Sequence, residues 1–175
     1  MLVYIQVMND LYIILGVSMT GKTTMANSFK DCYVIRSDDY TGKKSRFNTF
    51  DDAHKFICEQ INDLNADIVW DRSASRFNKI FKELEQIKNK RIHLICIELE
   101  DQVYLNYRKT TGRKVKKDFL FKKYHDRLNE LRATMRKLKE NGIKYTIFNG
   151  GDYINVDGRV VNMRLNLTVL GDFLE

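Results

Sequence analysis

Residues 16–23, GVSMTGKT, constrain the fold more than any other segment of this 175-residue chain. They have the spacing G-x-x-x-x-G-K-[ST], and they lie between the apolar run 11–17 and the helical pattern 22–30. Glycines in such a loop allow backbone amides to converge on phosphate oxygens, and the N-terminus of the following helix attracts anions. The segment therefore predicts a strand, a phosphate-binding loop and a helix, in that order.

Individual residues of this loop have distinct expected roles. Lys22 is expected to reach the β- and γ-phosphates of a nucleoside triphosphate, and the Thr23 hydroxyl to ligate the Mg²⁺ that bridges them. The predicted cofactors are therefore ATP and Mg²⁺. The residues expected to bind the nucleotide are Gly16, Ser18, Met19, Thr20, Gly21, Lys22, Thr23 and Thr24.

Apolar, strand-forming runs alternate with helical patterns along the chain. The expected strands cover residues 11–17, 32–37, 67–70, 91–99 and 143–148, and the expected helices cover residues 22–30, 50–64, 77–87, 101–109 and 118–141. Short apolar runs are typical of strands that are buried on both faces of a parallel sheet. The alternation predicts one α/β domain over residues 1–175, with a five-stranded, mainly parallel sheet and helices on both faces. Residues 150–175 are a C-terminal extension, expected to hold a small β element and a short helix.

Acidic residues follow the second and third predicted strands, in the segments 37–40 (SDDY) and 71–73 (DRS). In open α/β sheets, ligands bind beyond the carboxyl ends of the strands. Phosphoryl transfer to a hydroxyl requires a nearby carboxylate that accepts the hydroxyl proton. Asp38 is the expected base and Asp39 is the alternative, while both are expected at the substrate. A purely structural interpretation is that one of them caps the next turn.

The segment 71–73 supplies two further candidates. Asp71 closes an apolar strand, and we expect it to hold a Mg²⁺-bound water or to orient Thr23. The alternative for Asp71 is the N-cap of a helix that begins near Ser75. Arg72 is expected either to contact the substrate or to be an ordinary surface residue.

A basic segment precedes the last long helical pattern. Residues 107–117 carry six cationic side chains, and Gly112 allows the segment to bend. Closing arginines stabilise the charge of a transferred phosphoryl group, and closure excludes water. We therefore predict a mobile lid over residues 108–117, with Arg108 and Arg113 as its catalytic phosphate contacts. The alternative is a solvated, charged loop.

The combination of the loop 16–23, the segments 37–40 and 71–73, and an arginine-containing lid before a long helix resembles the P-loop kinases. Within that group the chain most resembles the small phage-type polynucleotide 5′-hydroxyl kinases, over most of residues 10–148. The DRS triplet is also similar to that of thymidylate and deoxynucleoside kinases.

This resemblance implies the three-layer P-loop kinase fold and ATP-dependent phosphoryl transfer. It implies that Asp38 is the general base and that Arg108 and Arg113 are the lid arginines. The family has an arginine shortly after its acidic element that contacts the substrate phosphate. Here Tyr40 is followed by residues 41–46, TGKKSR, so the sequence does not fix that contact.

The formal net charge of +7 favours a polyanionic partner, either a nucleotide or a nucleic acid. The first hypothesis is a kinase for the 5′-hydroxyl of a polynucleotide. The second is a nucleoside or nucleoside-monophosphate kinase of the thymidylate type. The third is a non-catalytic NTP-binding regulator, against which the lack of an NKxD base-recognition motif counts.

Cysteine usage and hydropathy favour a cytoplasmic protein without a membrane partner. Cys32, Cys58 and Cys96 are scattered in apolar stretches, so we expect them to be reduced and packed in the core. No apolar run approaches the roughly 18 residues that span a membrane. Met8 is an alternative start, because the recognisable fold begins just after it.

Overall fold

A computed structural model describes residues 7–18, 20–73, 76–99, 117–149, 153–156 and 159–162. The central sheet consists of β1 (Asn9–Gly16), β2 (Tyr33–Arg36), β3 (Ile68–Asp71), β4 (Lys90–Glu98) and β5 (Thr146–Asn149). The strand order is β2-β3-β1-β4-β5, and every neighbouring pair is parallel. The predicted five-stranded sheet is therefore confirmed, and β1 lies at its centre.

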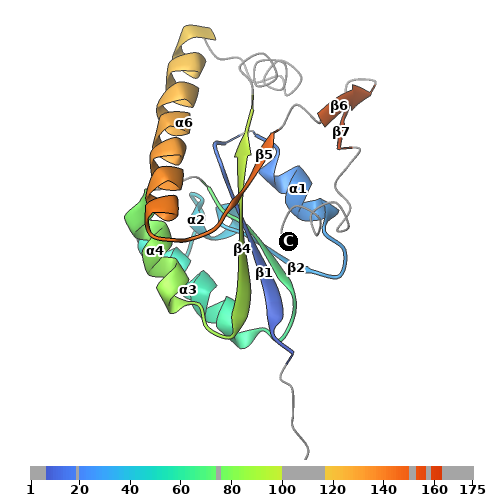
Figure 1. The fold of residues 1–175 in the computed structure, drawn as a ribbon, viewed down its shortest axis with the longest axis vertical. Coiled ribbons are helices and arrows are strands. Elements are labelled where there is room, and N and C mark those ends of the chain that lie inside the picture. Colours follow the sequence, from blue (N-terminus) through green and yellow to red (C-terminus); the bar gives the residue numbers. More distant parts are fainter. Residues whose placement is uncertain are drawn as a thin grey trace, which may run out of the picture.

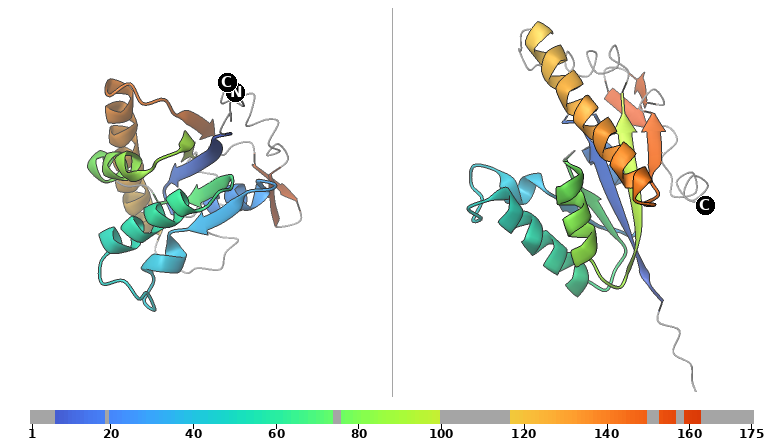
Figure 2. Two further views of the ribbon diagram at one scale, coloured as in Figure 1. Left: turned by 90° about the horizontal axis from the view of Figure 1, so that it is seen from below. Right: turned by 60° about the vertical axis from the view of Figure 1, so that its left-hand side comes forward.

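Helices cover both faces of this sheet. They are α1 (Lys22–Ser28), α2 (Asp38–Thr41), α3 (Phe50–Asp63), α4 (Phe77–Gln86) and α6 (Lys117–Glu140). Helix α1 lies on one face, and α3, α4 and α6 lie on the other, which confirms the three-layer α/β architecture (Figure 1). The first turns of α6 extend past the carboxyl ends of the strands (Figure 2). None of the described helices is long and apolar enough to cross a membrane.

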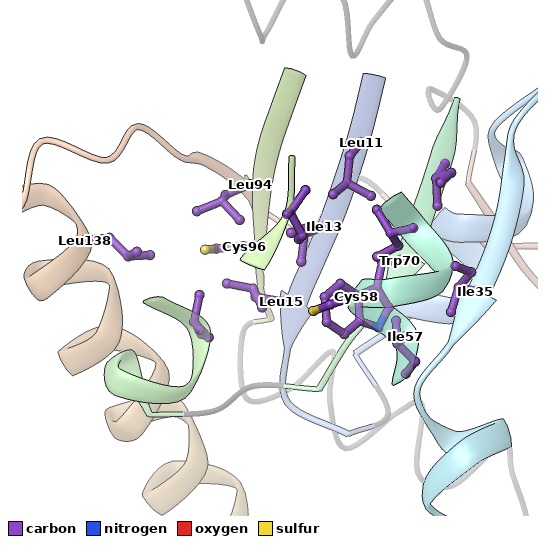
Figure 3. Close-up of a cluster of buried hydrophobic side chains, with 14 of the residues drawn as sticks. Leu11, Ile13, Leu15, Ile35, Ile57, Cys58, Trp70, Leu94, Cys96 and Leu138 are labelled. Atoms are coloured by element: carbon purple, nitrogen blue, oxygen red, sulfur yellow. The ribbon is translucent and has the colours of Figure 1, made fainter. Parts of the chain in front are cut away.

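Strand β1 is apolar on both faces because each face packs under helices. Leu11, Ile13 and Leu15 belong to the core cluster that also contains residues of α3, α4 and α6 (Figure 3). Ile14 belongs to the opposite cluster, which packs against Met25 of α1. Burial on both faces explains why the strand appears in the sequence as a nearly continuous apolar run.

The cysteines follow the prediction with one difference. Cys58 and Cys96 are free and buried in the core, as expected. Cys32 is also free but only partly buried, and it packs against the core cluster that contains Met25 of α1. Burial raises the pKa of the Cys58 and Cys96 thiols to about 12, so both thiols stay protonated at neutral pH.

The predicted stop of the long helix at residues 141–142 is confirmed in atomic detail. Gly142 has a φ of 72°, and its amide donates to the carbonyl of Lys139 at 3.0 Å. The amide of Ile143 donates to the carbonyl of Leu138 at 2.9 Å, which completes a Schellman cap. Ile143 thus belongs to the cap, and β5 begins at Thr146 rather than at the predicted residue 143.

The C-terminal extension contains the predicted small β element. Strands β6 (Tyr153–Val156) and β7 (Arg159–Asn162) form a separate antiparallel pair. The short helix predicted after it and the helix predicted at residues 101–109 lie outside the described residues.

Candidate active site

The conformation of the loop between β1 and α1 requires glycine at two positions. Gly21 has φ and ψ angles of 90° and 16°, a left-handed conformation, and it is the N-cap of α1. A Cβ atom at Gly16 would lie 2.9 Å from Oγ1 of Thr20 and 3.3 Å from the Lys22 side chain. Gly21 therefore allows the turn into the helix, and Gly16 allows the chain to fold closely over itself.

Hydrogen bonds inside the loop hold its polar side chains in place. The buried Thr20 hydroxyl donates to the carbonyl of Val17 at 2.7 Å, and Nζ of Lys22 donates to the same carbonyl at 2.9 Å. Burial lowers the pKa of Lys22, while the charges of Asp71 and Asp38 act to raise it. The Lys22 ammonium therefore lies within electrostatic reach of both predicted carboxylates.

Thr23 and Asp71 form a direct contact between α1 and β3. Thr23 Oγ1 donates to Asp71 Oδ2 at 2.7 Å, and the Asp71 side chain is buried at the end of β3. This pair matches the expectation that Asp71 orients Thr23. The alternative role of Asp71 as a helix N-cap is wrong, because the N-cap of α4 is Arg76.

The oxygen atoms of this pair suit Mg²⁺. Mg²⁺ favours hard oxygen ligands and usually keeps several waters beside one or two protein groups and substrate phosphates. Thr23 and Asp71 provide such a set, and no group of three or more His, Cys, Asp or Glu residues in the described part of the chain could hold a metal ion by itself. The residues therefore fit a magnesium ion shared with a nucleotide rather than a metal held by the protein alone.

Asp38 and Asp39 lie in the short helix α2, directly after the neighbouring strand β2. Both side chains are exposed, and neither makes a hydrogen bond or ion pair with another residue that the structure describes. Neither is the N-cap of α2, which is Ser37. Two unpaired carboxylates are thus available at the carboxyl end of β2.

Comparisons with known proteins agree on the fold. No protein-family model and no curated protein matches the chain. A sugar kinase from Janibacter sp. HTCC2649 is 13% identical, with 82% of this chain and 86% of that chain covered and a TM-score of 0.57. A gluconokinase from Sinorhizobium meliloti 1021 is 13% identical, with 80% and 83% covered and a TM-score of 0.53.

A third solved structure comes from the PezAT chromosomal toxin–antitoxin system of Streptococcus pneumoniae. It is 20% identical and has a TM-score of 0.54, with 95% of this chain and 76% of that chain covered. This chain has a P-loop kinase fold. At these identities the likeness establishes the fold alone, so the roles of individual residues rest on the geometry of the site.

Several of the predicted site residues lie outside the part of the chain that the structure describes. Met19 lies outside the described residues, as do residues 108–116 of the predicted lid with Arg108 and Arg113. Lys117, the last residue of the predicted lid, begins α6. Ser18 and Thr24 are exposed at the loop and at the first turn of α1.

Arg72 differs from both sequence interpretations. Its side chain is fully buried, so its assignment as a surface residue is wrong. Nε donates to Glu83 at 2.6 Å, one terminal nitrogen donates to Glu83 at 2.9 Å, and the other donates to the carbonyl of Ser73 at 2.8 Å. The expected substrate contact is not available to a guanidinium enclosed in this way.

Glu83 is a structural residue that the sequence analysis missed. It lies on the buried face of α4 and also accepts a hydrogen bond from Nδ1 of His54 at 2.6 Å. Burial acts to raise the pKa of Glu83, but the hydrogen bonds from His54 and Arg72 and the charge of Arg72 hold it below its usual value. Glu83 lies three residues after Ile80 and four residues before Ile87, which places it on the same face of the helix as these two apolar residues. That spacing in the sequence could have indicated a buried charge.

We expect Glu83→Ala to reduce the free energy of unfolding by about 3–5 kcal/mol, because it leaves the Arg72 guanidinium buried without a counter-ion. Glu85→Ala removes the same charge from an exposed position of α4 and is the control. Urea unfolding at neutral pH measures both. The stabilisation by Glu83 should decline as the pH falls below 4.5, because its pKa is depressed only in the folded state. An equal effect of the two variants would contradict the ion-pair role.

Proposed function

We propose that this protein is an ATP-dependent kinase that transfers a phosphoryl group to a hydroxyl, with the 5′-hydroxyl of a polynucleotide as the favoured acceptor. One observation carries the proposal: the Lys22 ammonium, the Thr23–Asp71 pair and the exposed Asp38 lie at the same edge of the sheet, at the carboxyl ends of the parallel strands β1, β3 and β2. In α/β folds this edge is where ligands bind. A cation, a magnesium-compatible oxygen pair and a free carboxylate are the groups that phosphoryl transfer requires.

In this proposal each side chain has one task. The phosphate loop and Lys22 bind and orient the triphosphate, and Thr23 and Asp71 hold Mg²⁺, which neutralises phosphate charge when bound. Asp38 accepts the proton of the acceptor hydroxyl, with Asp39 as the alternative base. Arg108 and Arg113 are proposed to contact the phosphates from the lid.

The segment after α2 supports a polyanionic acceptor. Lys43, Lys44 and Arg46 are exposed there, within eight residues of Asp38. The Arg46 guanidinium lies 5.0 Å from the ring centroid of Phe47 and 4.5 Å from that of Phe56. Arg46 has no acidic partner among the residues described. A guanidinium that lies over aromatic rings and has no acidic partner can still donate its N–H groups to phosphate oxygens.

The decisive experiment measures label transfer from γ-labelled ATP, with Mg²⁺, to 5′-hydroxyl DNA and RNA oligonucleotides, nucleosides and nucleoside monophosphates. Label on the oligonucleotides, with a KM that rises steeply with salt, is the expected result, because a polymer releases counterions on binding. Label on a mononucleoside or mononucleotide alone would replace the proposed acceptor with the thymidylate-like alternative. Binding of ATP without any transfer would favour the non-catalytic regulator.

The magnesium assignment predicts a specific defect in Asp71→Asn. The amide retains the shape of the side chain and can still accept the Thr23 hydroxyl bond, but it lacks the negative charge. We expect the Mg²⁺ concentration that gives half-maximal transfer to rise about tenfold or more, since removing a group that supports a metal site typically weakens metal affinity by roughly 10–100-fold. Magnesium titrations of transfer rate measure this, and an unchanged Mg²⁺ requirement would remove Asp71 from the site.

A further inference from the structure

One buried hydrogen bond joins the residues that precede the two proposed functional carboxylates. Nε1 of Trp70 donates to Oγ of Ser37 at 2.9 Å. Trp70 directly precedes Asp71, and Ser37 directly precedes Asp38. Both partners are almost completely buried, with exposures of 0% and 2%. The relative position of β3 and α2 therefore depends on this contact.

The other polar groups of Ser37 strengthen the same connection. Its amide donates to the carbonyl of Asp71 at 3.0 Å, so the backbone after β2 is bound to the end of β3. Its carbonyl accepts from the amides of Tyr40 and Thr41 at 3.0 and 3.1 Å, which closes the single turn of α2. Every polar group of Ser37 thus points either to β3 or into α2.

Helix α2 is held at its far end by Tyr40, which packs against the core and donates to Gln60 at 3.1 Å, while Asp38 and Asp39 lie exposed next to Ser37. The helix contains only four residues, 38–41, and none of them is buried. The Trp70 ring, in contrast, is held by its neighbours: Arg72 lies 5.7 Å from the ring centroid, and the His54 ring lies 5.3 Å away. Trp70 also packs in the core beside Ile57 and Cys58 (Figure 3). A rigid donor therefore fixes the N-cap of α2, the end of the helix that carries Asp38.

We propose that Ser37 and Trp70 are positioning residues that set Asp38 at a fixed distance from the Thr23–Asp71 pair. This inference rests on the proposed kinase function, in which both carboxylates act on the same reaction. A buried hydroxyl–indole pair can be replaced by apolar groups with little loss of stability. Its loss should instead appear in catalysis, where displacement of a reacting group by about 1 Å can reduce the rate by about 100-fold.

The test uses Ser37→Ala, Trp70→Phe and the double variant. We expect kcat for phosphoryl transfer to fall about 10- to 100-fold in all three, with little change in the KM for ATP. Thermal stability should fall in Ser37→Ala, which leaves the indole N–H buried without an acceptor, and in Trp70→Phe, which leaves a cavity in the core. The double variant should recover the part of the loss that is due to the unpaired N–H. Recovery of stability without recovery of kcat distinguishes positioning from a purely structural role. Ile61→Val, in the same core cluster, is the control that lowers stability and leaves kcat unchanged.

A second measurement is independent of activity. Trp70 is the only tryptophan of the chain, so its indole N–H gives a single assigned NMR signal. We expect Ser37→Ala to shift that signal upfield and to speed its hydrogen exchange. A shifted signal with normal kcat, or kcat that recovers with stability in the double variant, would overturn the positioning role alone. A wild-type protein that transfers no label to any acceptor would overturn the proposed function and this role with it.

Discussion

Lys22→Ala is expected to slow phosphoryl transfer by at least about a thousandfold and to weaken the binding of ATP. The ammonium lies in the phosphate loop, where it donates to the carbonyl of Val17 at 2.9 Å. In the transition state, charge develops on the β- and γ-phosphate oxygens, and a fixed cation in a site that excludes water stabilises it strongly; loss of one such group typically reduces kcat by about 10²–10³-fold. Loss of ground-state binding to the triphosphate adds to this effect.

The control for Lys22→Ala is Lys30→Ala, which removes the same charge from an exposed position beyond the end of α1. Burial lowers the pKa of Lys22, because the ammonium loses hydration in the folded loop, and we expect its removal to cost little stability. The variant should therefore remain folded, and circular dichroism checks that it does. Single-turnover transfer and ATP titration measure the two effects, and wild-type turnover in Lys22→Ala would refute the assignment of the phosphate loop.

The second large effect is expected for Asp38→Asn. If Asp38 accepts the proton of the acceptor hydroxyl, the amide cannot replace it, and kcat should fall by about 10²–10⁴-fold. The affinity for ATP should change little, because Asp38 lies in α2, outside the phosphate loop. Isothermal titration with ATP and Mg²⁺, together with the transfer assay, separates binding from chemistry.

Asp39→Asn is the matched control, since it makes the same change at the next position of the same helix. Both side chains are exposed, so neither substitution should disturb the core. A large loss in Asp39→Asn with normal activity in Asp38→Asn would move the base to Asp39. Full activity in both single variants and in the double variant would show that no carboxylate of α2 serves as the base.

The fold was predictable because its signals are local. The apolar run of β1, the glycine spacing of the loop and the Asn141-Gly142 helix stop each lie within a few neighbouring residues. The position of Asp71 in the site could also be predicted from the sequence, because parallel strands place their carboxyl ends at one edge of the sheet. Its hydrogen bond with Thr23, across 48 residues of sequence, follows from that topology.

The role of Arg72 was not predictable in the same way. An arginine beside an expected active site resembles a ligand-binding group, and its ion pair depends on how α4 packs against β3. The acceptor of the Trp70 indole likewise depends on the distance between two strands that are far apart in sequence. Packing between distant elements decides these contacts, whereas hydrophobic periodicity reports only which face of each element is buried.

The central place of β1 in the sheet also bears on how the chain acquires its structure during synthesis. β1 pairs with β3 and with β4, and Arg91 and His93 contact Asp10 across 81 and 83 residues of chain. Pairing between segments this far apart is slow, because long loops must close first. Until residues 90–98 have left the ribosome, β1 has an unpaired edge, and such edges are prone to aggregation. The strand that carries the phosphate loop is thus made before both of the strands with which it pairs, and it is enclosed only after β4 has been made.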